Sequence, residues 1–122
     1  MSENRVLVVD DDESIRELFE CIVNDLGYEC DTAPDGEAGV ERIKNRSYKV
    51  VFLDIKMPKL NGIETLKQIK QMNPGIIVTM MTGFSVDDLV EEALSLNASD
   101  VLYKPFDVET LEELITKWMS SQ

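Results

Sequence analysis

The chain has 122 residues, of which 43% are hydrophobic and 30% are charged, and its formal net charge is −12. This length fits one compact domain, which we expect to span residues 1–122, and the composition is typical of a globular core rather than of a disordered or membrane protein. The negative charge argues against direct binding of nucleic acid, which relies on clustered Lys and Arg. The apolar runs are too short to cross a membrane, and residues 1–4 hold no basic and apolar leader, so we expect a cytoplasmic protein.

Patterns typical of strands and helices alternate along the whole chain. Apolar runs predict strands at residues 5–9, 28–33, 50–53, 76–81 and 101–103. Apolar residues at helical spacing predict helices at 13–26, 37–45, 63–72, 85–96 and 108–119, and Gly27 is a suitable stop for the first of them. This alternation predicts a doubly wound α/β fold, with a parallel sheet covered on both faces and its ligand chemistry at the carboxyl ends of the strands.

Polar residues follow four of the five predicted strands: Asp10, Asp11 and Asp12 after the first, Asp54 after the third, Thr82 after the fourth and Lys104 after the fifth. Carboxylates that lie close together repel each other, and a hard divalent cation such as Mg²⁺ relieves that repulsion. A carboxylate beside such a cation can accept a phosphoryl group, whose oxygens a lysine and a threonine stabilise. Asp12 has an alternative reading as the N-cap of the helix that begins near Glu13.

Five segments containing these residues resemble the receiver domains of two-component response regulators: Val8-Val9-Asp10-Asp11, Leu53-Asp54-Ile55-Lys56-Met57-Pro58, Asn61-Gly62, Met81-Thr82-Gly83 and Lys104-Pro105-Phe106. The resemblance covers essentially the whole chain. It implies a flavodoxin-like sheet of five parallel strands in the order 2-1-3-4-5, flanked by five helices. It also implies a cis peptide bond between Lys104 and Pro105.

The same resemblance implies a role for each site residue. Asp54 would be the phosphoacceptor, and Thr82 and Lys104 would contact the phosphoryl oxygens. The Mg²⁺ ligands would be Asp54, Asp11, Asp10 through a water molecule, and the backbone carbonyl of Lys56. Such a domain is not an enzyme for foreign substrates, because it catalyses only its own phosphoryl transfer and slow dephosphorylation.

The sequence departs from the family pattern at two positions. Gly83 stands where alanine is more usual, which would loosen the loop beside Thr82. Val101 stands where many receivers carry an aromatic residue that moves on phosphorylation, and Tyr103 is not expected to replace it, because neighbouring strand residues point to opposite faces. By the same resemblance, Lys56 and Phe84 are hypothesised to set water access to the acyl phosphate.

The chain has no histidine, so a partner must supply the phosphoryl group. The resemblance implies a histidine kinase or a histidine phosphotransfer protein, docked over the acidic edge and the first helix. In that helix we expect Phe19, Ile22 and Leu26 in the core, whereas Ile15 and Leu18 are either core or donor contacts.

A downstream protein target is expected to read a change of shape in the fourth helix and fifth strand. Leu89, Val90, Val101 and Trp118 are candidates for that region, although all four also suit an ordinary core.

Other readings remain beside this one. The chain could be a stand-alone regulator, which we favour, or the amino-terminal part of a larger DNA-binding regulator, or a binding module that is never phosphorylated. A magnesium-dependent phosphatase is disfavoured because Lys56 stands where such an enzyme needs a second acid. A flavin carrier is disfavoured because the acids after the first strand would repel phosphate. Cys21 and Cys30 fit neither a disulfide framework nor a zinc site, and we expect two free, buried thiols.

Overall fold

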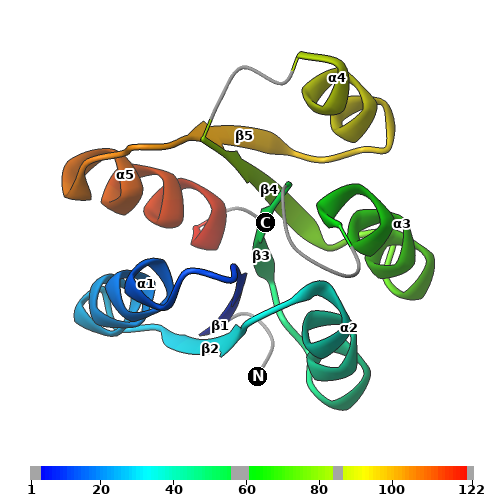
Figure 1. Cartoon of the computed structure of the whole chain (residues 1–122). Helices are drawn as coiled ribbons and strands as arrows, with labels where there is room; N and C mark the ends of the chain where they lie inside the picture. Colours follow the sequence, from blue (N-terminus) through cyan, green and yellow to red (C-terminus); the bar gives the residue numbers. More distant parts are fainter. Residues whose placement is uncertain (1–3, 56–60, 84–86, 121–122) are drawn as a thin grey trace.

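The computed structural model describes residues 4–55, 61–83 and 87–120, and within them ten helices and strands alternate (Figure 1). In chain order they are β1 (Arg5–Val9), α1 (Glu13–Asp25), β2 (Glu29–Ala33), α2 (Gly36–Asn45), β3 (Val50–Asp54), α3 (Gly62–Met72), β4 (Ile77–Thr82), α4 (Asp87–Ser95), β5 (Asp100–Tyr103) and α5 (Val108–Met119). The predicted elements are confirmed with their ends shifted by one or two residues. Residues 85 and 86 of the fourth predicted helix lie outside the described residues.

The five strands form one parallel sheet in the order β2-β1-β3-β4-β5, which confirms the predicted topology. Figure 1 shows α1 and α5 on one face of the sheet and α2, α3 and α4 on the other. Covering both faces in this way explains why β1 and β3 read as continuous apolar runs. Because β1 and β3 are neighbours, the residues that follow them come together at one edge of the sheet.

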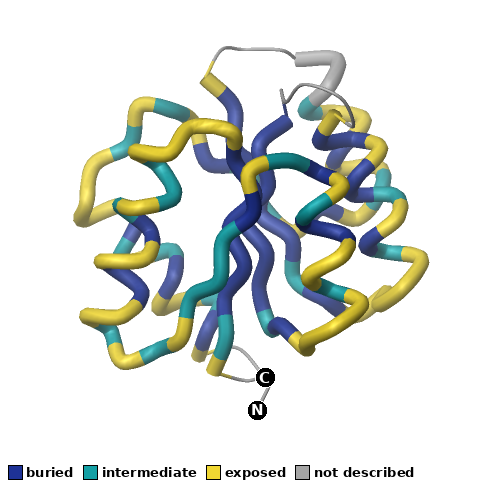
Figure 2. Tube along the Cα trace, turned by 60° about the horizontal axis from the view of Figure 1, so that its bottom comes forward, coloured by how far each residue is buried: buried dark blue, intermediate teal, exposed yellow. Residues whose placement is uncertain are grey.

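The core lies in two layers, one on each face of the sheet, and Figure 2 shows the buried central strands between them. The first core layer, under α2, α3 and α4, includes Leu7, Val9, Val51, Leu53, Ile63, Leu66, Val78, Met80 and Ala93. The second core layer, under α1 and α5, includes Val6, Val8, Phe19, Ile22, Phe52, Met81, Leu102, Leu111 and Ile115. Adjacent strand residues alternate between the layers, as the pleat requires.

The expected core residues of α1 lie in or against the second core layer. Phe19 and Ile22 are buried, and Leu26, Ile15 and Leu18 are partly buried and packed against that layer. Phe19 also contacts Phe52 and Phe106, with ring centroids 4.9 and 5.9 Å apart respectively. This aromatic cluster anchors the segment after β5 to the first helix.

Three of the four remaining core candidates are partly buried. Val90 and Val101 pack against the first core layer and Trp118 packs against the second. The side chain of Leu89 lies outside the described residues.

The start and end of α1 are defined by local chemistry. The carboxylate of Asp12 accepts a hydrogen bond from the Ser14 amide, which confirms the N-cap reading of that residue. At the other end Gly27 adopts φ 90°, a left-handed conformation that favours glycine and ends the helix. Asn61 caps α3 in the same way as Asp12, by accepting from the Glu64 amide.

None of the described helices combines the length and the apolar character needed to cross a membrane.

Both cysteines are free thiols, but the expectation that both are buried is wrong for Cys21. Cys21 is exposed because it lies two residues beyond Phe19, about 200° around the helix from the buried stripe. Cys30 is partly buried, and burial, together with the charges of Glu20 and Asp31, raises the pKa of its thiol to about 12.

A network centred on Asp31 lies along the edge strand β2, of which Asp31 is the middle residue. Its carboxylate accepts a 2.6 Å hydrogen bond from the hydroxyl of Tyr48, which is 3% exposed, and a 3.2 Å bond from Arg46. Arg5 lies 3.8 Å from the same carboxylate oxygen and pairs with Glu29 at 2.8 Å. This network ties the edge strand β2 to β1 and to the turn before β3.

Candidate functional site

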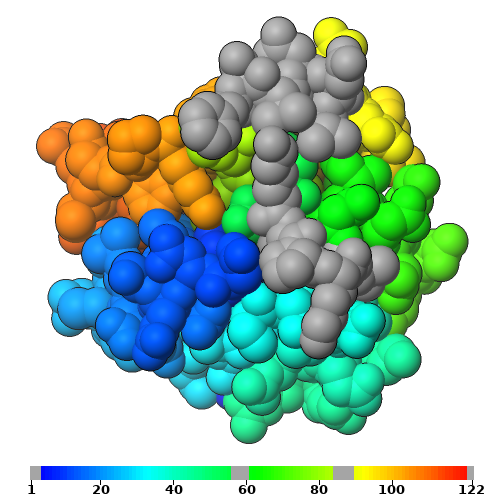
Figure 3. Space-filling view, viewed as in Figure 1, coloured from blue at the N-terminus to red at the C-terminus, as the bar shows by residue number. Residues whose placement is uncertain are grey.

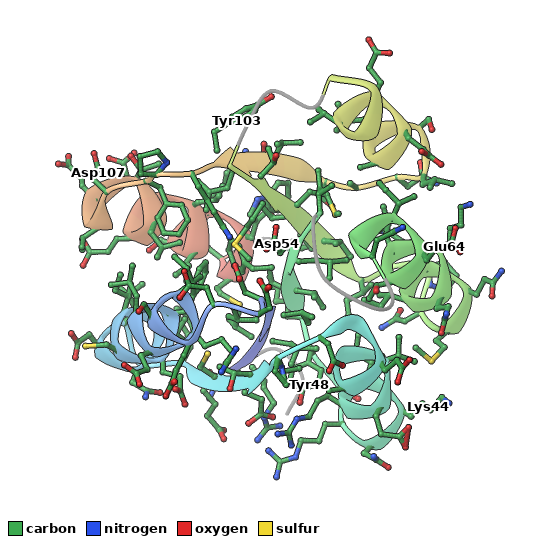
Figure 4. All side chains as sticks on the ribbon, viewed as in Figure 1. Lys44, Tyr48, Asp54, Glu64, Tyr103 and Asp107 are labelled. Carbon is green, nitrogen blue, oxygen red and sulfur yellow. The ribbon has the colours of Figure 1, made fainter. Side chains whose placement is uncertain are left out.

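Three carboxylates meet where β1 and β3 end. One oxygen of each of Asp10, Asp11 and Asp54 can be chosen so that all three lie within 4.8 Å of one another. Asp10 is fully buried and Asp54 is 6% exposed, whereas Asp11 is exposed. Figure 4 labels Asp54 at the end of β3, in the middle of the view. The structure therefore brings together the three acidic side chains proposed from sequence, with two of them inside the protein.

Lys104 reaches this acidic group from the end of β5. Its ammonium lies 2.7 Å from a carboxylate oxygen of Asp10 and 3.3 Å from one of Asp54. Burial by itself would lower the pKa of Lys104, but the hydrogen bonds and charges of Asp10 and Asp54 outweigh it, so the pKa lies above the ordinary value. The lysine is thus held in its charged form between the two buried carboxylates.

A backbone hydrogen bond fixes the position of Lys104 at the end of β5. Its amide donates a 2.7 Å hydrogen bond to the carbonyl of Thr82, which continues the pairing of β5 with β4 by one step. The peptide bond between Lys104 and Pro105 is cis, as expected. Figure 3 shows the residues after β5 (orange) against the residues after β1 (blue) on the face seen in Figure 1.

Thr82 is the last residue of β4 and is 2% exposed. Because β4 lies between β3 and β5, Thr82 stands between the strand that carries Asp54 and the strand that leads to Lys104. The amide of Ile55 donates a 2.9 Å hydrogen bond to the carbonyl of Met81, which fixes the ends of β3 and β4 together. The threonine therefore lies at the same edge of the sheet as the acidic group.

Every polar atom of Asp10 has a partner. Its amide donates to Ala33, and its two carboxylate oxygens accept from the Asp12 amide and from Lys104. Its carbonyl oxygen accepts a 2.8 Å hydrogen bond from the guanidinium of Arg16 on α1. Sequence reasoning did not single out Arg16, because a lone arginine on a helix has no spacing signal that separates it from a solvated surface cation.

Gly62 packs against the backbone of Asp54, the phosphoacceptor candidate. It is the first residue of α3, and its amide donates a 2.9 Å hydrogen bond to the carbonyl of Ile55. A Cβ atom at this position would overlap the backbone carbonyl oxygen of Asp54 and lie 2.6 Å from the Cα of Ile55. The start of α3 therefore rests directly on the backbone of Asp54, which only glycine permits.

Three sequence interpretations near the site have different outcomes. Lys56 and Phe84 lie outside the described residues, so the carbonyl ligand and the water-access hypothesis stay predictions. Val101 is confirmed as a partly buried residue against the first core layer. The reason for excluding Tyr103 was wrong: Leu102 belongs to the opposite layer, so alternation puts Tyr103 on the side of Val101, where its side chain is 54% exposed.

The fold and this edge define a class of protein, the doubly wound α/β domains with their chemistry at the carboxyl ends of parallel strands. Within that class, the chain belongs to the response regulator receiver domain family, whose family model matches residues 6–116. The sequence resemblance to receiver domains is thereby confirmed.

Relatives of this chain include both short and long proteins. Sporulation initiation phosphotransferase F of Bacillus subtilis is 31% identical over 119 residues, which cover 98% of this chain and 96% of that protein. The transcriptional regulatory protein ZraR of Escherichia coli is 36% identical over 112 residues, which cover 92% of this chain. The chain spans about a quarter of the length of the ZraR proteins, which are the first curated relatives that it matches.

Solved structures show the same architecture. A CheY-like response regulator receiver domain protein from Methanospirillum hungatei has a TM-score of 0.92 and 29% identity, covering 96% of this chain and 94% of that one. The receiver domain of NtrX from Brucella abortus has a TM-score of 0.88 and 32% identity, covering 96% of this chain and 99% of that one.

Proposed function

We propose that residues 1–122 form one receiver domain that accepts a phosphoryl group on the carboxylate of Asp54 from a phosphohistidine of another protein. The observation that carries this proposal is the position of Lys104, whose ammonium lies between Asp10 and Asp54 in a chain of the receiver family. A partly buried cation at that point is suited to the extra negative charge of a phosphorylated Asp54.

In the proposed reaction, a carboxylate oxygen of Asp54 attacks the phosphorus of the donor. A P–O bond forms as the P–N bond of the phosphohistidine breaks, and the electrons of that bond leave with the imidazole nitrogen, which takes up a proton from water. The product is an acyl phosphate on Asp54. This chain contains no histidine, so the donor lies outside it.

The residues at the edge fit a hard divalent cation, because their side-chain donors are three carboxylates and include no histidine or thiol. Asp10, Asp11 and Asp54 would hold Mg²⁺, together with the carbonyl of Lys56 that the family resemblance implies. When bound, Mg²⁺ supplies charge neutralisation at the phosphoryl oxygens. Lys104 would pair with one phosphoryl oxygen, and the hydroxyl of Thr82 would donate a hydrogen bond to another.

The proposed partners are a histidine kinase or a histidine phosphotransfer protein as donor, and a protein target that reads the phosphorylated form. Phosphorylation adds about −1.5 to −2 charges at neutral pH, which gives Thr82 and Lys104 a new group to bind. The chain would act on no foreign substrate beyond its own phosphorylation and dephosphorylation. Its two free thiols support a cytoplasmic location, where thiols stay reduced.

Relatives of both lengths leave two settings for this domain. One is a short relay protein, similar to sporulation initiation phosphotransferase F, and the other is the receiver part of a longer transcriptional regulator such as ZraR. The net charge of −12 argues against direct contact of this domain with nucleic acid.

Intact mass spectrometry tests the proposal. The chain is incubated with acetyl phosphate, with and without Mg²⁺, and wild type is compared with Asp54→Asn, which keeps the shape of the side chain and removes the nucleophile. Asp12→Asn is the matched control, because asparagine caps a helix as well as aspartate does. We expect one phosphoryl group on wild type and on Asp12→Asn only when Mg²⁺ is present, and none on Asp54→Asn.

Two results would count against the proposal. Labelling of Asp54→Asn at the wild-type level would move the acceptor to another residue. No labelling of wild type, while a control receiver is labelled, would favour a binding module that is never phosphorylated.

A further inference from the structure

Arg16 donates to a backbone carbonyl, as Lys49 and Lys70 do, but its acceptor belongs to a residue of the acidic group. It lies in the second turn of α1, and its guanidinium donates a 2.8 Å hydrogen bond to the backbone carbonyl of Asp10, whose carboxylate belongs to the acidic group. None of the ion pairs among the described residues includes Arg16. Arg16 therefore binds the backbone of Asp10, next to the acidic side chains.

That hydrogen bond fixes one peptide plane. The carbonyl of Asp10, the amide of Asp11 and both Cα atoms are coplanar, so holding the oxygen of Asp10 also orients the Cα of Asp11. On the other side, the amide of Asp12 donates a 2.9 Å hydrogen bond to the Asp10 carboxylate, which holds the next peptide plane. Asp11 thus stands between two fixed planes, although its own side chain is exposed.

Strand pairing does not provide this restraint. Pairing of β1 with β3 ends at Val9 and Leu53, and the amide of Asp10, not its carbonyl, is what pairs with the end of β2. Within the described residues, Arg16 is the donor recorded for the Asp10 carbonyl. Without it, the peptide plane between Asp10 and Asp11 would lose the hydrogen bond that orients its carbonyl.

We propose that Arg16 is a positioning residue of the acidic site: it orients Asp11 through the Asp10 carbonyl and thereby sets the affinity of the site for a divalent cation. This inference rests on the proposed function, because it assumes that the acidic group binds such a cation. A ligand held in place before the cation arrives loses less conformational freedom on binding, and partners that orient metal ligands typically change metal affinity by about 10- to 100-fold.

The positive charge of Arg16 and its hydrogen bond to Asp10 have opposite effects on the affinity for Mg²⁺. A cation near the acidic group repels Mg²⁺, so loss of the charge alone would tighten binding. Loss of the hydrogen bond would weaken binding. The sign of the change in the dissociation constant therefore separates the two roles.

The test measures metal binding with no phosphoryl donor present. Mn²⁺ is titrated into wild type, Arg16→Ala and Arg42→Ala, the free ion is followed by EPR, and Mg²⁺ is then used as a competitor. Arg42→Ala is the matched control, because it makes the same change of charge and helix propensity on the exposed side of α2. We expect Mn²⁺ and Mg²⁺ to bind Arg16→Ala about tenfold more weakly, and Arg42→Ala as they bind wild type.

Other outcomes overturn the inference. Equal or tighter binding by Arg16→Ala would show that Arg16 affects metal affinity at most through its charge, and not by positioning Asp11. A lower number of bound ions with an unchanged dissociation constant would show a purely structural role, since misfolded chains lower the stoichiometry alone. If Arg16→Ala does not fold, Arg16→Lys is measured instead; its ammonium keeps the charge, so weaker binding by that variant reports the lost geometry and wild-type binding overturns the inference.

Phosphorylation by acetyl phosphate is scored separately on the same samples. If wild type binds Mn²⁺ but is not phosphorylated, the phosphoacceptor proposal fails and the dissociation constants still decide the role of Arg16. If wild type is phosphorylated and Arg16→Ala binds metal as wild type does, only the role of Arg16 fails. A wild type that binds neither ion overturns both.

Discussion

Replacing Gly62 by alanine tests how closely α3 rests on β3, the strand that ends in Asp54. The added methyl group would overlap the carbonyl oxygen of Asp54 and lie 2.6 Å from the Cα of Ile55. Both contacts are with backbone, so no side-chain rotation can relieve them. Either the start of α3 or the end of β3 must move, and the hydrogen bond from the Gly62 amide to Ile55 must lengthen with it.

The expected size of the effect follows from overpacking, which typically costs about 1–3 kcal/mol. Alanine recovers part of this through its lower unfolded-state entropy, about 0.4–1 kcal/mol. Because both contacts are with backbone, we take the upper end of the overpacking range, which leaves a net loss of about 2 kcal/mol. With an unfolding entropy of about 2.1 cal/mol/K per residue, each kcal/mol lowers the Tm of a 122-residue domain by about 4 °C, so the Tm should fall by about 8 °C.

The matched control is Gly83→Ala, at the other glycine of the site. No heavy atom of the described residues lies within 4 Å of a Cβ built at Gly83, and its backbone is not left-handed. Thermal unfolding of both variants, followed by circular dichroism, should place Gly83→Ala at or slightly above wild type and Gly62→Ala well below it. Equal Tm values for the two variants would refute the contact between α3 and Asp54.

Two further predictions concern groups away from the acidic edge. Burial and the hydrogen bond to Asp31 raise the pKa of Tyr48, so its contribution to stability is complete below the ordinary tyrosine pKa of about 10 and is lost as the pH rises towards the folded-state value. In urea titrations from pH 7 to 11, wild type should therefore lose stability above pH 10 more steeply than Tyr48→Phe, and parallel curves would contradict this. Iodoacetamide at pH 8 should alkylate exposed Cys21 rapidly but Cys30 only in urea, because burial raises the pKa of Cys30 to about 12; peptide mapping that finds equal rates would show that Cys30 is not shielded.

The sequence predicted the sheet well because its central strands β1, β3 and β4 are buried on both faces. Continuous apolar runs such as Val50 to Leu53 stand out against the helical spacing that follows them, and order along the chain then restricts the topology. The side chains at the strand ends were also predictable, since parallel strands end at one edge. Their positions at the strand ends predicted that Asp10, Asp54 and Lys104 would lie at one edge of the sheet, but not that the lysine bridges the two carboxylates.

The features that sequence missed all depend on direction or on contact across the fold. Cys21 lies in an apolar stretch, yet the helix turns it away from the buried stripe. Arg16 and Gly62 contact the backbone carbonyls of Asp10 and Asp54, which lie earlier in the chain, and a carbonyl has the same chemical character at every residue. Tyr103 was misplaced for a simpler reason, because residues two apart in a strand share a face.

The network around Asp31 also constrains how this chain could change over evolutionary time. Loss of Asp31 first would leave the buried hydroxyl of Tyr48 without its acceptor, at a cost of about 1–3 kcal/mol. Conversion of Tyr48 to phenylalanine first would leave Asp31 still paired with Arg46, and only one hydrogen bond would be lost. The two substitutions are therefore unequal as first steps, and descendants that have lost the pair should have passed through phenylalanine at position 48.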